Sequence, residues 1–322
     1  MTTTTEGARL AQMRRALFEQ RVRAGGSRPA AQPRAVTSRT ASGPLPLSVS
    51  QSQLWYLSQL APDSPVYNEL ITIHKAGALD EEALHRALTE VVARHEAWRT
   101  TFDCIDGVPY QFVHEPMEVD LPLVDLSHLS TEEAKHRAIE IATADTLRPY
   151  DLVQGPLVRP RLIRIAADDH RLYLEMHHLV FDGTTLHRVV FPELVALYRS
   201  YATGVPSWLP DPQSQYADYT MWELDWVRRP EAAARIERWR SRLAGSTPTQ
   251  LPLDHPRPPR QTFAGGTIPL TIDHATVDGL RRAAAAAGGT LFHALAAAYA
   301  WWLHLYADST DVVFGTPHDL RH

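Results

Sequence analysis

The chain has few of the features that mark secreted or membrane proteins. Its 322 residues contain a single cysteine, Cys104, which excludes an internal disulfide and fits a reducing cytoplasm. No apolar run reaches the roughly 20 residues of a membrane-spanning helix, and no signal-peptide core follows Met1. The longest apolar stretch, residues 291–306, contains two histidines and predicts a buried helix instead. We therefore expect a cytoplasmic protein with no membrane partner.

Strong net charge is also lacking. The formal net charge is −5, so the chain has no excess of basic residues with which to bind nucleic acid or anionic lipid. We expect no nucleic-acid partner. A length of 322 residues exceeds that of a typical single domain and predicts two lobes, each with its own core.

The first 46 residues divide into two segments. Residues 1–24 carry apolar side chains at helical spacing between 6 and 24, separated by arginines, which predicts a short amphipathic helix. This helix either packs on its own domain or serves as a docking segment for an upstream protein, and both interpretations stay open. Residues 25–46 are rich in Gly, Ser, Pro and Ala, contain no acidic residue, and predict a flexible linker.

Capping and turn signals place the elements of the folded part, which begins near residue 47. Asp80 is expected to N-cap one helix, and Ser130 with Glu133 forms a capping box that opens another. Asp106-Gly107 predicts a hairpin turn. Side-chain patterns predict a helix at 184–198 and strands at 67–76, 98–103, 110–114, 157–165 and 172–178. This mixture of hairpins and helical crossovers favours a layered α/β sandwich.

The last third of the chain predicts a second, smaller unit. Its expected elements are helices at 230–243, 275–287 and 290–306 and strands at 267–272 and 311–315. We assign residues 47–228 to a complete N-terminal lobe and 229–322 to the start of a C-terminal lobe. That second unit is too short to close a core of its own, so the chain is expected to be cut off at His322.

Two adjacent histidines at the end of a predicted strand are the strongest candidates for chemistry. Side chains alternate along a strand, so His177 and His178 should point to opposite faces. One imidazole can accept a proton from an amine or hydroxyl that attacks a carbonyl. Asp182 can orient an imidazole or anchor the turn through an arginine, and Gly183 lets the backbone turn without a Cβ clash.

Two other interpretations of the histidine pair compete with catalysis. A metal site needs a third ligand and converging side chains, which neighbours on opposite faces do not supply, so we expect no metal. A purely structural pair is the other interpretation, and it stays open.

Several stretches then resemble one family. His177 to Gly183 matches the HHxxxDG motif of the condensation domains of nonribosomal peptide synthetases. Ser50–Leu57 is similar to the family's SxAQxRLWxL motif, Arg94–Phe102 to RHExLRTxF, and Tyr216–Trp222 to YxDYAxW. Phe314–Pro317 resembles the core of the next motif. The resemblance covers about Pro46 to His322, with these motifs in the family's order.

The resemblance implies a chloramphenicol-acetyltransferase-like fold with two lobes around a tunnel. Phosphopantetheine arms of donor and acceptor carrier proteins would enter this tunnel, so no tightly bound cofactor is expected. The α-amine of the carrier-bound aminoacyl thioester would attack the donor acyl thioester and form an amide. The sequence of the helix after the motif resembles condensation domains that receive polyketide chains, so the resemblance implies a nonribosomal peptide synthetase and leaves a polyketide/peptide hybrid open.

The resemblance also assigns residue roles. His178 would face the tunnel as base or positioning group, and His177 would face the interior. Asp182 would form an ion pair with Arg99, the backbone amide of Gly183 would stabilise an oxyanion, and Arg94 and Arg99 would support the motif. Two alternatives remain open. One is a free-standing acyltransferase. The other is a module that binds carrier proteins and is catalytically inactive because the chain is truncated.

Overall fold

A computed structural model of the chain describes residues 36–40, 43–259 and 261–317. The amphipathic helix expected at 1–24 lies outside the described residues, as do positions 25–35 of the expected linker.

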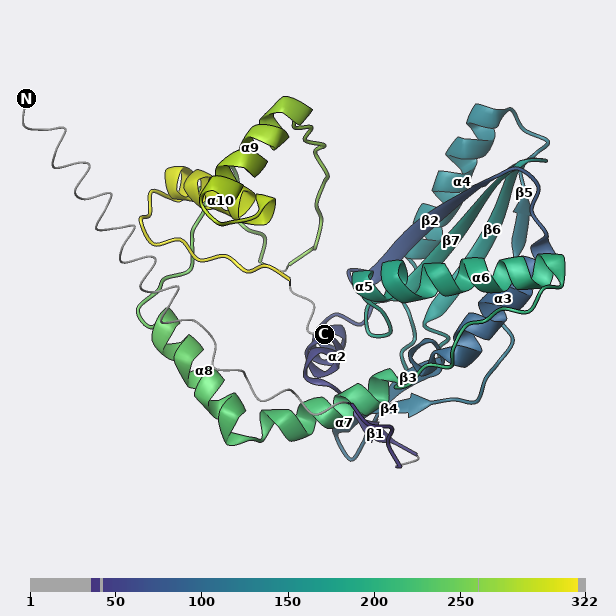
Figure 1. Cartoon of the computed structure of the whole chain (residues 1–322), viewed down its shortest axis with the longest axis horizontal. Helices are drawn as coiled ribbons and strands as arrows, with labels where there is room; N and C mark the ends of the chain where they lie inside the picture. The colour runs from purple at the N-terminus through teal and green to yellow at the C-terminus, as the bar shows by residue number, and fades with distance from the viewer. Residues whose placement is uncertain (1–35, 41–42, 260, 318–322) are drawn as a thin grey trace, which may run out of the picture.

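A four-stranded mixed sheet forms the centre of the fold (Figure 1). Its strand order is β2 (Asn68–Ala76), β7 (Asp169–His177), β6 (Val158–Ala166) and β5 (Leu123–Asp125). β7 pairs antiparallel with both neighbours, while β5 runs parallel to β6. The histidine pair therefore lies at the end of an interior strand, held on both sides by the sheet.

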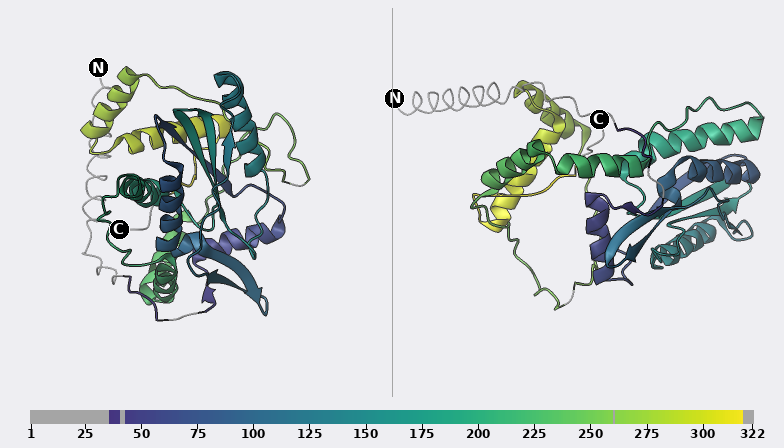
Figure 2. Two further views of the ribbon diagram at one scale, coloured as in Figure 1. Left: turned by 90° about the vertical axis from the view of Figure 1, so that its right-hand side faces the viewer. Right: turned by 90° about the horizontal axis from the view of Figure 1, so that it is seen from below.

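Helices cover both faces of this sheet, so the predicted layered α/β sandwich is confirmed (Figures 1 and 2). On one face, Leu172, Leu174 and Met176 of β7 join the main core beneath α3 (Glu81–Arg94) and α6 (Phe191–Thr203). On the other face, Tyr173 joins a smaller core with α4 (Thr131–Thr146). The helix α4 can approach closely because its buried side chains are all alanines, namely Ala134, Ala138 and Ala142.

The local signals placed most element ends correctly. The carboxylate of Asp80 accepts a hydrogen bond from the Ala83 amide at the start of α3, and Ser130 with Glu133 forms the expected capping box of α4. The turn at Asp106 and Gly107 has positive φ at both residues, 50° and 78°, as a tight hairpin turn requires. It joins β3 (Thr100–Ile105) to β4 (Val108–Val113).

The linker predicted over 25–46 is wrong at its carboxyl end. Leu45–Pro46 forms the short strand β1, which pairs with β4 and completes a second, three-stranded sheet. The Leu45 side chain is buried, and this burial stabilises the folded position of the segment. The Pro-rich and Ser-rich composition of the segment did not indicate such a contact. Helix α2 (Val49–Leu60) follows directly, with Ser48 and Gln51 forming its capping box.

From residue 204 onward, the only regular elements of the described chain are helices. They are α7 (Tyr216–Val227), α8 (Pro230–Leu243), α9 (His274–Ala286) and α10 (Leu291–Ala307). The strands predicted at 267–272 and 311–315 are wrong, because a strand needs a paired neighbour and no described segment pairs with either. Ile268 and Leu270 are 92% and 84% exposed as a result.

The helix expected at 291–306 forms, but the expectation that it is buried is wrong. Leu303 is the only buried residue of α10, and Trp301 is 64% exposed. The two predicted strands that would have packed against it are not formed.

No single described helix is long and apolar enough to cross a membrane, and the bent pair α9 and α10 meets that test only when both are taken together.

Candidate active site

The backbone around the histidine pair is tied to both neighbouring strands. The amide of His177 donates to the carbonyl oxygen of Leu157, just before β6, at 3.0 Å. The amide of His178 donates to the carbonyl oxygen of Tyr67, just before β2, at 2.9 Å. Both imidazoles are therefore attached to a backbone that the sheet holds rigid.

The two imidazoles differ sharply in exposure, as strand alternation predicts. His177 is 5% exposed and faces the protein, whereas His178 is exposed. The Nδ1 atom of His178 lies 3.2 Å from the carbonyl oxygen of Phe181, and its ring stacks on the Phe181 ring at a centroid distance of 5.1 Å. A carbonyl oxygen can only accept, so Nδ1 must donate. The lone pair of neutral His178 is then on Nε2, on an exposed ring.

His177 has the opposite tautomer. Its Nδ1 accepts a hydrogen bond from the Leu179 amide at 3.2 Å, so the ring hydrogen of the neutral form is on Nε2. Burial lowers the pKa of His177 to about 4, and the nearby charges of His178 and Arg159 act in the same direction. His177 is thus uncharged at neutral pH, and the edges of the Tyr67 and Tyr150 rings surround it.

Asp182 caps the helical turn that follows the motif. It is the N-cap of α5 (Gly183–Thr185), and its Oδ1 accepts from the amide and the hydroxyl of Thr185 at 2.8 and 2.9 Å. The predicted ion pair between Asp182 and Arg99 is wrong. Arg99 instead donates to the carbonyl oxygen of His114, and its guanidinium lies 4.0 Å from the carboxylate of Glu96.

The space beside Gly183 is open. A Cβ at this position would meet no atom within 4 Å, so the expected steric need for glycine is wrong here. A substrate could approach the backbone at Gly183, whose amide is the first of the turn and has no acceptor within it.

The helix predicted at 184–198 is interrupted by a π-helical turn, Leu186–Val190, between α5 and α6. π-helical turns occur frequently at functional sites. The turn keeps Leu186 and Val190 buried while His187 and Arg188 are exposed. Apolar spacing alone cannot distinguish such a turn from a regular helix.

Arg94 and His95 fix the helix that follows the motif. Arg94 Nε and His95 Nε2 each lie 2.9 Å from Oε2 of Glu193, in the first turn of α6. Burial of Glu193 opposes its ionisation, but the bonds from Arg94 and His95 outweigh burial and lower its pKa. Sequence analysis missed Glu193, because its partners lie far away in the chain and no local pattern links them.

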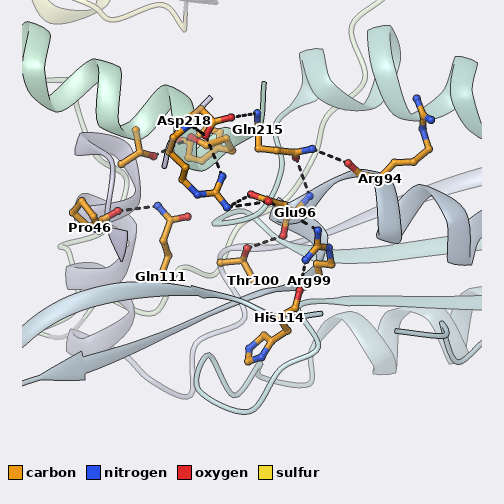
Figure 3. Close-up of polar contacts among 12 residues, drawn as sticks. Pro46, Arg94, Glu96, Arg99, Thr100, Gln111, His114, Gln215 and Asp218 are labelled. Atoms are coloured by element: carbon orange, nitrogen blue, oxygen red, sulfur yellow. Dashed lines mark hydrogen bonds and ion pairs between the residues drawn. The ribbon is translucent and has the colours of Figure 1, made fainter. Parts of the chain in front are cut away.

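A second polar cluster includes Glu96, Gln215 and Asp218 (Figure 3), and Arg39 pairs with its two carboxylates. The Arg39 guanidinium lies 2.8 Å from the Glu96 carboxylate and 3.1 Å from that of Asp218, and the Arg39 amide also donates to Asp218 at 2.9 Å. Gln215 extends the cluster by accepting from the Glu96 amide and donating to the carbonyl oxygen of Arg94. The clustered side chains come from the predicted linker, from the RHExLRTxF-like stretch and from the start of α7. Sequence analysis missed Arg39, which it assigned to the linker.

A pocket of about 750 Å³ lies on the His177 side of the motif. Its walls come from α2 and the loop after it, from the start of β2, and from residues 150–153. His178 is not among its lining residues. Among the residues that the structure describes, no three His, Cys, Asp or Glu side chains are grouped to hold a metal ion.

Comparison with known proteins identifies the family. A family model described as "Condensation domain" matches residues 41–322. The chain is 37% identical over 277 residues to a linear gramicidin synthase of Brevibacillus parabrevis, and the match covers 85% of this chain and 4% of that protein. It is 34% identical over 314 residues to the phosphinothricin tripeptide synthetase PhsC of Streptomyces viridochromogenes, covering 97% of this chain and 29% of that protein. The chain spans less than a third of either relative.

Solved structures agree. The X-domain from teicoplanin biosynthesis matches with a TM-score of 0.73 and 28% identity, over 84% of this chain and 59% of that one. A variant of the starter condensation domain of the rhizomide synthetase RzmA matches with a TM-score of 0.59 and 25% identity, over 65% of this chain and 50% of that one. The fold is therefore the chloramphenicol-acetyltransferase-like α/β sandwich, and the chain belongs to the condensation domain family of nonribosomal peptide synthetases.

Proposed function

We propose that this chain forms an amide bond between two carrier-bound substrates, with His178 as the catalytic residue. The observation that carries the proposal is the hydrogen bond from His178 Nδ1 to Phe181, which leaves the lone pair of an exposed imidazole on Nε2. Condensation domains are amide-forming acyltransferases. The donor would be an acyl thioester, the acceptor an aminoacyl thioester, and each would arrive on the phosphopantetheine arm of a carrier protein.

In the proposed step, Nε2 of His178 accepts a proton from the attacking α-amine as nitrogen bonds to the thioester carbon. The tetrahedral intermediate then collapses, the C–S bond breaks, and the proton passes to the departing pantetheine sulfur. One amine and one thioester give one amide and one thiol. Aminolysis of a thioester is intrinsically favourable, so holding the amine against the thioester can contribute more than the basicity of the imidazole.

The turn that follows the motif would stabilise the negative charge of the tetrahedral intermediate. Asp182 fixes the turn by capping it, and the backbone amide of Gly183 is the proposed donor to the oxyanion of the intermediate. The open space beside Gly183 leaves room for that oxygen. In this proposal Asp182 is structural and does not take a proton.

The wider setting is also proposed. Residues 47–228 would form the N-terminal lobe and 229–322 part of the C-terminal one, with the substrate tunnel between them. Residues 6–24 would dock on an upstream synthase, which in a polyketide/peptide hybrid would deliver the donor chain. The family match over residues 41–322 supports the two-lobe assignment, and the amphipathic pattern of residues 6–24 supports the docking segment.

The decisive experiment compares His178→Ala with the unsubstituted protein, using loaded donor and acceptor carrier proteins and mass spectrometry of the acceptor-bound amide. We expect the rate to fall by roughly 10²- to 10⁴-fold, the usual contribution of a general base. The matched control is His136→Ala, an exposed histidine on α4, which should keep the full rate. Near-normal turnover by His178→Ala would reject the assignment.

A non-catalytic binding module is the second candidate. The observation in its favour is the match to the X-domain from teicoplanin biosynthesis, which was also solved in a complex with OxyB. Under this alternative the unsubstituted protein would bind carrier proteins but release no amide from any loaded pair. A free-standing acyltransferase would instead form product from small thioesters without any carrier.

A further inference from the structure

The face of β7 that carries His177 also carries a buried acid. Glu175 lies two positions before His177 on this strand, so both side chains point to the same face of the sheet. Glu175 is 2% exposed, and burial raises its pKa. A buried carboxylate is costly unless a cation pairs with it. Arg159 of the neighbouring strand β6 supplies that cation, with its Nη2 atom 2.5 Å from Oε1 of Glu175.

Arg159 makes a second contact that the ion pair does not require. Its guanidinium lies over the ring of Tyr150, with the central carbon 3.6 Å from the ring centroid. The Nη2 atom also donates to the carbonyl oxygen of Arg148 at 2.8 Å, so the guanidinium is held from two sides. A planar guanidinium fixed in this way stacks well on an aromatic face. Arg159 therefore restrains the Tyr150 ring.

Tyr150 passes this restraint to His177. It lies in the loop between α4 and β6, so side-chain contacts rather than a strand or helix fix its position. The ring centroids of Tyr150 and His177 are 5.9 Å apart with an interplanar angle of 80°, an edge-to-face contact. The orientation of the His177 imidazole therefore depends on where the Tyr150 ring is held.

His177 in turn holds the turn that separates it from Phe181. Its Nδ1 atom accepts from the Leu179 amide at 3.2 Å, and its carbonyl oxygen accepts from the Val180 amide at 3.0 Å. The next residue, Phe181, fixes the His178 ring by a hydrogen bond and by stacking. A change in the orientation of His177 would thus move the residue that directs His178.

We propose that Arg159 is a positioning residue for the reaction, because it fixes His178 through Tyr150, His177 and the turn that follows. The inference rests on the proposed function for the role of His178. Arg159 itself contacts no reacting atom. Without it, the turn would still form but would hold Nε2 of His178 in a less defined direction.

Two double variants separate stacking from the loss of an ion pair. The stacking variant is Arg159→Met with Glu175→Gln, which removes the guanidinium from Tyr150 and leaves no uncompensated charge in the core. The pair control is Arg161→Met with Asp145→Asn. Arg161 lies two positions further along the same face of β6, and its Nε atom is 2.5 Å from the carboxylate of Asp145 on α4. The control thus removes an equivalent ion pair but leaves the stack on Tyr150 intact.

Hydrogen exchange of the Leu179 amide provides a measurement without turnover, because this amide donates to His177. In the stacking variant we expect its exchange, followed by NMR, to become roughly 3- to 10-fold faster, as the loss of about one hydrogen bond would give. In the pair control it should keep its rate. The amides of β7 report opening of the whole sheet and should change no more in the stacking variant than in the control.

Substitutions of Tyr150 test the stack without altering the ion pair. Tyr150→Phe keeps a ring beneath the guanidinium and should retain the slow exchange of Leu179. Tyr150→Leu removes the ring and should speed that exchange as the stacking variant does. If the stacking variant does not fold, these two single substitutions supply the same comparison.

The carrier-protein assay then connects position to rate. The stacking variant should lower the maximal rate roughly 10- to 100-fold, with little change in the carrier concentration that gives half of that rate, and the pair control should keep the full rate. Leu179 exchange that matches the pair control, or that rises equally along β7, would overturn the inference. An unsubstituted protein that forms no amide would instead reject the proposed function, and the exchange rates would still decide the role of Arg159.

Discussion

The Nδ1 atom of His178 lies 3.2 Å from the carbonyl oxygen of Phe181, and the two rings stack with an interplanar angle of 20°. The same residue thus fixes the imidazole twice, through its backbone and through its side chain. The hydrogen bond sets the tautomer, and the stacked ring sets the direction in which Nε2 points. Phe181 occupies a variable position of the HHxxxDG pattern, yet it is the direct neighbour of the His178 ring, the proposed catalytic group.

Phe181→Ala should therefore impair catalysis without direct contact with the reacting atoms. We expect the maximal rate to fall on the order of 10- to 100-fold, because the imidazole loses its fixed direction. Because the backbone carbonyl of residue 181 remains, nitrogen NMR of His178 should show mainly the Nδ1–H form in both proteins, which separates the loss of stacking from a change of tautomer. Phe181→Tyr keeps the stacked ring and serves as the control; equal damage from both variants would contradict the role of stacking.

Asp182→Ala should act mainly on stability. The substitution removes the cap of the turn after the motif, which costs about 0.5–2 kcal/mol at a helix N-terminus. Thermal unfolding should show a lower midpoint, while Asp182→Ser, another good capping residue, should recover most of the loss. A variant Asp182→Ala that unfolds normally yet forms no amide would instead indicate a catalytic carboxylate.

Arg39→Met should destabilise the protein although it lies before the first family motif. It removes the cation from the Glu96 and Asp218 carboxylates, whose side chains are 16% and 4% exposed. We expect a loss of about 1–3 kcal/mol in urea unfolding, below the full value for a completely buried pair. The control is Arg240→Met, in an exposed pair on α8, which should cost less than about 0.5 kcal/mol.

Adding Asp218→Asn and Glu96→Gln to Arg39→Met should recover part of that loss. Both amides remain able to accept hydrogen bonds but no longer place uncompensated charge in the cluster. If the triple variant loses more stability than the three single substitutions added together, the charges are not what holds the cluster together.

His177 predicts a pH dependence of stability. Its pKa is about 4 in the folded protein, against about 6.5 when unfolded, so only the unfolded chain gains a proton between these values. Stability should therefore fall as the pH is lowered from about 6.5 to about 4, by a total of about 3 kcal/mol from this residue. Urea unfolding across this range should show the slope in the unsubstituted protein and a smaller one in His177→Gln; equal slopes would place the titration elsewhere.

Local signals predicted the scaffold of the site well. The alternation along residues 172–178 placed Leu172 and Leu174 on one face and separated the two histidines, and Asp80 and Ser130 marked their helix ends correctly. These features depend on neighbours within a few positions, which a sequence displays directly. The family motifs then identified the fold and the candidate catalytic pair.

Contacts between distant segments could not be predicted in this way. Asp182 was assigned to Arg99 by resemblance, whereas Arg99 bonds to His114 and Glu96, closer to it along the chain. Leu45 and Arg39 were assigned to a linker because composition does not reveal which loop residues find a partner. Residues 267–272 alternate and residues 311–315 contain a short apolar run, but pairing with a neighbour decides whether a strand forms.

The Arg39 cluster bears on how such domains are exchanged between synthetases. The stretch that matches the family begins at residue 41, two positions after the arginine that pairs with two acids of the family's motifs. A chimera joined at that boundary would keep Glu96 and Asp218 but take residue 39 from the other parent. Junctions placed before residue 36 would carry the arginine along with the carboxylates it serves, and we expect such chimeras to give more soluble, better folded protein.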